Sequence, residues 1–203
     1  MPVITSIKPQ KNKRRVNVYL DGKFGFGIDL DNFVKLGLKV EQELAEEEVE
    51  EIVKKSEFQK TLDKLLKFAT LRPRSEKEIK DWLKRKKVHE SLHKELFNRL
   101  KRLDLMDDEK FALWWIGQRQ EFSPRAKRMM NYELRMKGIK QETINEILEN
   151  TEIDEEKMAK DLLVKKAYKW KGLDKLKARQ KISQFLARKG FSWDVIEKVV
   201  EKR

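Results

Sequence analysis

The sequence predicts an all-α protein made of three tandem three-helix repeats in an elongated, curved array, preceded by a small N-terminal β-hairpin and short helices. Three observations support this prediction. Hydrophobic residues make up 39% of the 203 positions and charged residues 41%, while Gly (8) and Pro (4) are scarce, which suits narrow apolar stripes on helices better than one deep core or a disordered chain. A set of residues recurs 51 and then 52 positions further along the chain. Two alternating apolar runs flank Asp21-Gly22.

Residues 1–55 are expected to form the β-hairpin and the short helices. Apolar residues alternate over 16–20 and again over 24–28, on either side of Asp21-Gly22. Asp-Gly favours a type I′ turn, because both central positions of that turn need positive φ. Beyond the hairpin, Asp31 is expected to cap a short helix that ends near Gly37, and an acidic helix is expected over 43–55.

The internal repeat divides the rest of the chain into units 56–107, 108–152 and 153–203. The aligned positions are Ile79, Leu83, Lys86, Lys87, Val88 and Leu96; Met130, Leu134, Lys137, Gly138, Ile139 and Ile147; and Ile182, Leu186, Lys189, Gly190, Phe191 and Val199. Gly138 and Gly190 are expected in the left-handed conformation that ends a middle helix, and Lys87 stands there in the first unit. Such units bury their apolar faces against their neighbours.

Capping signals mark the expected helix starts. Ser75 and Glu78 have the spacing of a capping box. Ser123-Pro124 predicts an N-cap followed by proline at the first helical position. The remaining caps are Asp107 or Asp108 for the second unit and Asp154 for the third.

Composition and charge exclude several classes of protein. There is no cysteine, which excludes disulfides, thiolate catalysis and Cys-ligated zinc. No stretch has the roughly 18 consecutive apolar residues of a membrane span, and the N-terminus lacks a signal-peptide pattern, so we expect a cytoplasmic protein that does not engage membranes. The net charge is +13, of which residues 1–57 contribute −1 and residues 58–203 contribute +14. A basic field of this kind attracts polyanions, nucleic acid first and an acidic protein or a membrane surface second.

Both histidines lie in His89-Glu90-Ser91-Leu92-His93, a literal H-E-x-x-H. In zinc peptidases this spacing places two histidines one turn apart on a helix, with the glutamate as general base. The repeat instead places His89 in the turn before the third helix of its unit. A residue in a turn is not helical, so His89 and His93 would not lie one helical turn apart on the same face. We expect no catalytic residue, metal or cofactor, and a zinc peptidase built on His89, Glu90 and His93 is the enzymatic alternative.

The middle helices have dense positive charge with aromatic residues between. The plainer interpretation of most of these residues is a solvated helix face. Arginines are singled out because the planar guanidinium suits phosphate and carboxylate, and Trp170, among four lysines, is the strongest candidate for an exposed ring on which a base stacks. The partner-binding candidates are Arg72, Arg74, Lys84, Arg85, Arg119, Arg125, Lys127, Arg128, Arg135, Lys169, Trp170, Lys177 and Arg188.

Several strings resemble the RecX family, regulators of the bacterial recombinase RecA. They are Arg72-Pro73-Arg74-Ser75-x-x-Glu78-Ile79 with Leu83; Asp104 to Asp108 leading into Phe111-Ala112; Arg135-x-Lys137-Gly138-Ile139 with Ile144; and Lys189-Gly190-Phe191. The resemblance covers about residues 56–203, and residues 1–55 resemble the leader of some longer members.

The resemblance implies a non-enzymatic inhibitor of RecA. Such a protein binds the RecA filament on single-stranded DNA and suppresses its ATPase, strand-exchange and SOS or recombinational-repair activities. The implied partners are RecA, single-stranded DNA and, as a further candidate, double-stranded DNA, and we expect a monomer. The alternative is an independent helical nucleic-acid-binding protein that acts through its basic surface alone.

Overall fold

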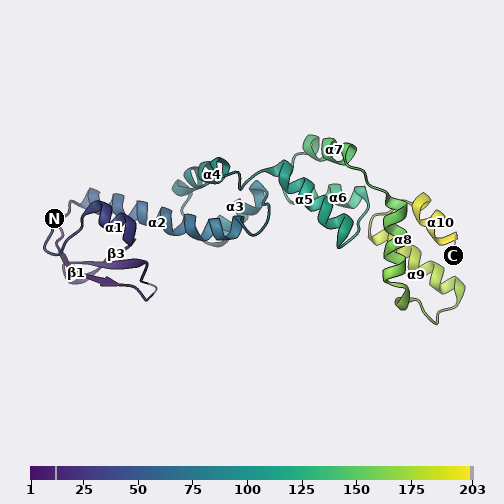
Figure 1. Ribbon diagram of the computed structural model, residues 1–203, viewed down its shortest axis with the longest axis horizontal. Helices are drawn as coiled ribbons and strands as arrows, with labels where there is room; N and C mark the ends of the chain where they lie inside the picture. The colour runs from purple at the N-terminus through teal and green to yellow at the C-terminus, as the bar shows by residue number, and fades with distance from the viewer. Residues whose placement is uncertain (12, 202–203) are drawn as a thin grey trace. The chain divides into compact units, whose positions relative to one another are not determined.

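The computed structural model describes residues 1–11 and 13–201, which form a three-stranded antiparallel sheet followed by ten α-helices and two short 3-10 helices (Figure 1). The chain forms two compact units, Met1–Leu71 with Val88–Leu100, and Arg72–Lys87 with Lys101–Arg203. Residues 202–203, the end of the expected third repeat, lie outside the described residues. Among the described helices, none combines the length and the apolar composition that a membrane crossing requires.

The N-terminal sheet contains the predicted hairpin and one more strand. Strands β1 (Ile4–Pro9), β2 (Arg15–Leu20) and β3 (Lys23–Asp29) pair in the order β1-β2-β3. Asp21 and Gly22 both have positive φ, 49° and 79°, as the predicted turn requires. The Asp21 carboxylate also accepts a hydrogen bond from the Val3 backbone at 3.0 Å. The weakly alternating segment before the hairpin therefore forms a third strand.

The two helices that follow the sheet differ from their predicted limits. Helix α1 (Leu30–Leu36) ends at Gly37 with φ of 60°, as expected, but its N-cap is Asp29 and not Asp31. The expected helix over 43–55 begins at Glu46 and continues to Ala69 as α2, so the division at residue 55 falls inside a helix. No helix-breaking residue interrupts this stretch. Ser56, in the middle of α2, is buried and donates a hydrogen bond to the Gly27 carbonyl of β3. This bond satisfies the Ser56 hydroxyl within the compact unit that contains the sheet.

The remaining helices follow the repeat. They are α3 (Glu76–Arg85), 3-10 helix η1 (Glu90–Leu92), α4 (His93–Arg102), α5 (Asp108–Glu121), α6 (Lys127–Met136), α7 (Gln141–Asn150), α8 (Glu155–Lys165), 3-10 helix η2 (Ala167–Lys169), α9 (Lys175–Arg188) and α10 (Trp193–Glu201). The middle helices α3, α6 and α9 are followed at the aligned position by Lys87, Gly138 and Gly190, with φ of 53°, 83° and 90°. The repeat is thus confirmed at the level of backbone conformation.

Most of the predicted caps are present. Ser75, Asp107 and Asp154 each accept a hydrogen bond from a backbone N–H in the first turn of α3, α5 and α8. The second middle helix differs, because α6 begins only at Lys127 and its N-cap is Ala126, whose side chain makes no capping bond. Ser123-Pro124 therefore lies before the helix start and does not cap it.

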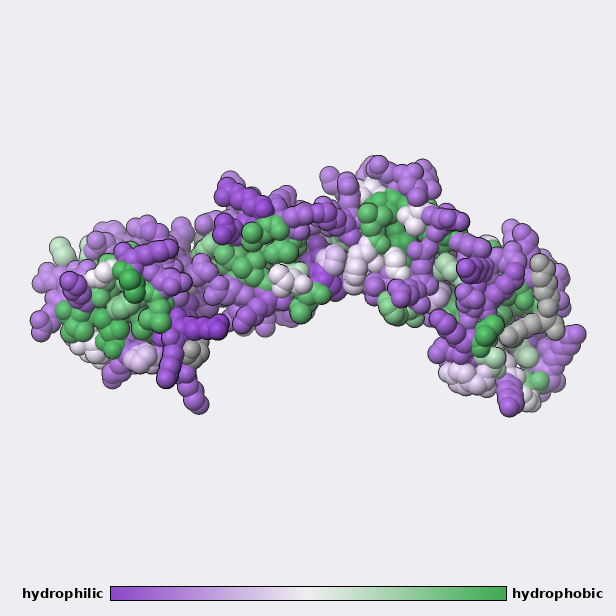
Figure 2. All heavy atoms as spheres, viewed as in Figure 1, coloured by the Kyte–Doolittle hydropathy of each residue, from purple (hydrophilic) through white to green (hydrophobic). Residues whose placement is uncertain are grey.

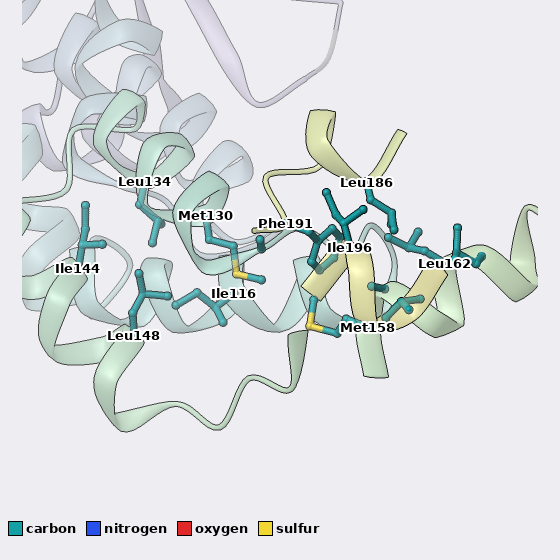
Figure 3. Close-up of a cluster of buried hydrophobic side chains, with 14 of the residues drawn as sticks. Ile116, Met130, Leu134, Ile144, Leu148, Met158, Leu162, Leu186, Phe191 and Ile196 are labelled. Atoms are coloured by element: carbon teal, nitrogen blue, oxygen red, sulfur yellow. The ribbon is translucent and has the colours of Figure 1, made fainter. Parts of the chain in front are cut away.

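Helices α5 to α10 share one apolar core. Phe191, between α9 and α10, belongs to the same buried cluster as Met130 of α6 and Met158 of α8. Figure 3 shows side chains of this cluster from Ile144 of α7 at one end to Leu162 of α8 at the other. The second and third three-helix repeats thus bury their apolar faces against each other, as expected for repeats that lack a complete core of their own. Hydrophilic side chains are spread over the visible face of every part of the chain (Figure 2).

Candidate partner-binding surface at the helix junctions

Consecutive middle helices meet at equivalent positions twice within the compact unit formed by Arg72–Lys87 and Lys101–Arg203. The Ser75 hydroxyl at the start of α3 donates to the carbonyl of Lys137 at the end of α6, at 2.8 Å. The Ala126 backbone N–H at the start of α6 donates to the carbonyl of Lys189 at the end of α9, at 3.1 Å. Because Ser75 and Ala126 are equivalent in the repeat, as are Lys137 and Lys189, equivalent positions meet at both junctions, through a hydroxyl donor at the first and a backbone N–H donor at the second.

An acidic side chain from the next triplet completes each junction. The Asp108 carboxylate at the start of α5 accepts from the Glu76 N–H of α3 at 2.8 Å, and Glu155 at the start of α8 accepts from the Lys127 N–H of α6 at 2.7 Å. Each first helix thus caps the preceding middle helix, whose first N–H groups have no partner in their own helix. Burial raises the pKa of Asp108 despite this hydrogen bond.

The glycines after α6 and α9 allow this close approach. A Cβ at Gly138 would lie 2.7 Å from Cβ of Lys77, and one at Gly190 would lie 2.8 Å from Cβ of Met129. Both positions also have positive φ, which glycine tolerates best. At the first unit's equivalent position Lys87 is exposed and accepts the same backbone conformation with a side chain.

The first junction gathers several cations around Glu78. Arg72 contacts its carboxylate at 2.9 Å and Lys137 at 2.8 Å, and Arg74 lies 3.8 Å away. The Glu78 side chain is only 12% exposed. Burial by itself would raise the pKa of Glu78, but hydrogen bonds from Arg72 and Lys137 outweigh it and hold the pKa below its usual value. Glu78 therefore binds cations across the junction instead of closing the predicted capping box.

The second junction gathers cations around Glu133. Its carboxylate accepts from Arg119 Nε at 2.5 Å and from Trp115 Nε1 at 2.9 Å, and Arg125 Nε lies 3.5 Å away. Lys189 is also close enough to interact. Burial lowers the pKa of Lys189, and the positive charges of Arg125 and Arg119 lower it further. The single carboxylate thus faces more positive charge than it neutralises.

Aromatic rings join the two clusters into a continuous surface. The Arg72 guanidinium lies over the Trp114 ring at 4.9 Å, and the Arg119 guanidinium lies over the Trp115 ring at 4.3 Å. Lys137 of the first cluster also lies over Trp115, at 5.1 Å. Cation–π contacts of this kind hold the cations in place. We call the resulting set the junction row: Arg72, Arg74, Glu78, Trp114, Lys137, Trp115, Arg119, Glu133, Arg125 and Lys189.

The junction row is suited to binding anions. Each cluster sets at least two cations against one carboxylate, so each has local positive charge left over. Arginine binds phosphate and carboxylate bidentately, and partial burial weakens the screening by water and salt.

The structure separates the predicted candidates into three groups. The junction row contains Arg72, Arg119 and Arg125, which are partly exposed, and Arg74, which is buried at 8% exposed. Lys127, Arg128 and Arg135 line a hollow between α6 and α7. The exposed candidates outside both places are Lys84, Arg85, Lys169, Lys177 and Arg188, and of these Lys177 pairs with Asp174 at 3.3 Å.

Trp170 is not the exposed ring that was expected. It is 9% exposed and packs edge-on against Phe185 of α9, with ring centroids 5.5 Å apart. The surrounding lysines indicated a solvated ring, but the chain turns through η2 just before Trp170 and directs the indole into the core cluster. The exposed tryptophan of this triplet is Trp193.

The H-E-x-x-H segment does not form the helical arrangement of a zinc peptidase. His89 has an extended backbone and precedes η1, while His93 begins α4. His89 Nδ1 lies 2.9 Å from the Ser91 hydroxyl, and His93 Nε2 lies 3.0 Å from the Val88 carbonyl. Within residues 1–11 and 13–201, no group of three or more His, Asp or Glu side chains is placed to hold a metal ion.

Four charged residues of the junction row are not among the predicted partner-binding candidates: Glu78, Glu133, Lys137 and Lys189. The repeat alignment contained part of the signal, because Lys137 and Lys189 occupy equivalent positions. It did not contain their partners, because Glu78 and Glu133 occupy different positions in their repeats. Glu78 lies 59 residues before Lys137, and Glu133 lies 56 residues before Lys189.

Acid is expected to weaken the first junction through Glu78. Its folded-state pKa is lowered, so its stabilising contribution is fully present above the unfolded value near 4.5 and is lost as pH falls through the folded value. Thermal unfolding between pH 7 and pH 3 should therefore show a fall in stability below about pH 4.5 that is smaller in Glu78→Gln. An identical pH dependence in both proteins would contradict this role of Glu78.

Comparison with known proteins gives a consistent result over the whole chain. Family models described as "Regulatory protein RecX N-terminal domain", "RecX, second three-helix domain" and "RecX, third three-helix domain" match residues 2–45, 107–148 and 154–200. A regulatory protein RecX of Bacillus licheniformis is 37% identical over 100% of this chain and 78% of its own length. One from Clostridium perfringens is 34% identical over 100% of this chain and 96% of its own.

Two solved structures are similar as well. A crystal structure of regulatory protein RecX matches with a TM-score of 0.66 and 25% identity, covering 100% of both chains. A crystal structure of RecX from Lactobacillus salivarius matches with a TM-score of 0.57 and 25% identity, over 72% of this chain and 96% of that one.

Proposed function

Because the chain belongs to the RecX family of regulatory proteins, we propose that it inhibits the RecA recombinase. In this proposal it binds the RecA filament on single-stranded DNA and suppresses ATP hydrolysis and strand exchange, and with them the SOS response and recombinational repair. It acts by binding, without catalysis of its own, as a cytoplasmic monomer.

The observation that supports the proposal best is that a carboxylate surrounded by cations lies at each of two consecutive junctions. Glu78 faces Arg72, Arg74 and Lys137, and Glu133 faces Arg119 and Arg125. A filament on single-stranded DNA presents phosphates and acidic side chains at regular intervals, and complementary charge speeds and orients such encounters. A row with surplus positive charge at successive helix junctions is complementary to a partner of that kind.

The independent nucleic-acid-binding protein is the second candidate function. It is favoured by Arg128 and Arg135, which are exposed and lie outside the junction row. The two candidates differ in one measurable respect, because only the first requires an effect on RecA.

The test measures RecA ATP hydrolysis on single-stranded DNA with increasing amounts of this protein. We expect turnover to fall at amounts well below one chain per RecA, and strand exchange to fall in parallel. Unchanged turnover at saturating protein, with DNA binding intact, would favour the second candidate function.

Lys189→Gln tests whether the junction row is the contact surface. Since burial and neighbouring cations already disfavour the charged form of Lys189, removing its charge should leave the fold intact. We expect the concentration for half-inhibition to rise by about 3- to 30-fold. Lys198→Gln, a neutralisation of an exposed lysine on α10, is the control and should match the unmodified protein. Equal inhibition by both variants would exclude Lys189 as a contact.

A further inference from the structure

A second polar site lies on the other side of α6 from the junction row. A hollow of about 480 Å³ opens between α6 and α7, and its α6 wall is formed by residues of one helix face. Arg128, Tyr132 and Arg135 follow one another four and then three residues apart, so their side chains lie along the same face. Tyr132 is 59% exposed.

Apart from Lys127, whose ammonium group donates to the Leu148 carbonyl at 3.3 Å, the side chains of this wall have no partners within the part of the chain that the structure describes. Arg128 and Arg135 form no ion pair there, unlike Arg72 and Arg119 of the junction row. The side-chain amide of Asn131, which also lines the hollow, has no hydrogen-bond partner among the same residues. An exposed ring, a free amide and two free guanidinium groups thus surround one cavity.

We propose that this hollow binds single-stranded nucleic acid, with one base stacked on Tyr132, the Asn131 amide at a base edge, and Arg128 and Arg135 at phosphates. The inference rests on the proposed function, which brings the chain to single-stranded DNA, and it assigns the contact to named residues. Stacking on an aromatic ring with cations along the backbone is a sequence-tolerant way to bind a single strand.

The lining favours nucleic acid over a protein segment. Leu148 is the only aliphatic residue among the described residues that line the hollow. A peptide anchor needs a desolvated apolar pocket, whereas a base needs a ring face and a hydrogen-bonding edge. The two arginines outnumber the one acidic residue of the lining, Glu149, and leave the site positive even without Lys127.

The experiment measures binding of a fluorescently labelled oligothymidylate to the full chain by anisotropy. Tyr132→Ala should raise the dissociation constant by about 5- to 150-fold, and Tyr132→Phe, which keeps the ring, should stay close to the unmodified protein. Tyr168→Ala is the matched control, because Tyr168 is 65% exposed and lies in η2, outside the hollow. The double variant Arg128→Gln with Arg135→Gln should lower the salt slope by about 1.4, or 0.7 per phosphate contact.

Three outcomes would overturn the proposal. They are failure of the unmodified protein to bind the oligonucleotide, equal losses in Tyr132→Ala and Tyr168→Ala, or normal oligonucleotide binding by Tyr132→Ala together with loss of RecA binding, which would identify a protein contact. Circular dichroism checks that each variant is folded. RecA ATP hydrolysis measured with the same proteins keeps the two proposals separate. Loss of oligonucleotide binding in Tyr132→Ala without any effect of the unmodified protein on RecA would refute only the proposed function.

Discussion

Gly190→Ala is expected to lower the free energy of unfolding of the compact unit that contains α5 to α10 by about 2–5 kcal/mol. Of this loss, roughly 1–2 kcal/mol comes from a side chain at positive φ and roughly 1–3 kcal/mol from overpacking. Gly190 has φ of 90° and is buried, and an added Cβ would lie 2.8 Å from Cβ of Met129 and 3.3 Å from its backbone nitrogen. Because one of these atoms belongs to the backbone of α6, a rotamer change cannot relieve the overlap. The α6–α9 junction has to open.

Gly172→Ala provides the matched control. Gly172 has nearly the same φ, 85°, but a Cβ there would have no neighbour within 4 Å. Gly172→Ala should therefore lower the free energy of unfolding by only about 1–2 kcal/mol, which is the cost of a side chain in this backbone conformation. Urea denaturation of the three proteins measures both terms, and the difference between the variants isolates the close approach of the helices. Equal losses in the two variants would mean that packing at Gly190 is unimportant.

Glu78→Gln is expected to lower the free energy of unfolding by about 2–4 kcal/mol, somewhat less than the loss from breaking a fully buried ion pair. The carboxylate is 12% exposed and faces Arg72 and Lys137, which would remain as neighbouring positive charges without a counter-ion. Glu142→Gln, on an exposed position of α7, is the control and should change stability by less than about 0.5 kcal/mol.

A second substitution shows whether charge is the cause. If the loss in Glu78→Gln comes from uncompensated cations, Glu78→Gln combined with Lys137→Gln should recover part of it. The double-mutant cycle measures this coupling directly. Additive losses would show that Glu78 acts through its shape and hydrogen bonds rather than through its charge.

Much of the fold could be predicted from the sequence because its signals are local. The Asp21-Gly22 turn needs only the φ preferences of two residues, and both have positive φ in the structure. Ser75, Asp107 and Asp154 cap helices through N–H groups two or three residues away. Gly138 and Gly190 were found by repeat alignment, which reports a backbone conformation that each unit needs at the same place.

The errors arise where a residue's partner is remote in sequence. Helix α2 continues past Lys55, and the Ser56 hydroxyl in its middle donates to the Gly27 carbonyl of β3. Trp170 was placed at the surface on the strength of its neighbouring lysines, yet its ring packs against Phe185. Glu78 has the spacing of a capping box, but cations from Arg72 and Lys137 compete for its carboxylate and bind it.

The sequence by itself determined the helical class, the repeat, the surplus of positive charge after residue 57 and the resemblance to RecX regulators. Tertiary structure alone decided which of those charges act together. Arg125 and Arg128 are three residues apart and look equivalent in the sequence, yet Arg125 faces Glu133 and Arg128 lines the hollow beside Tyr132. The physical reason is that helix propensity and capping depend on neighbours within one turn, whereas charge compensation depends on which helices meet. Lys137 reaches Glu78 across 59 residues only because α6 packs against α3.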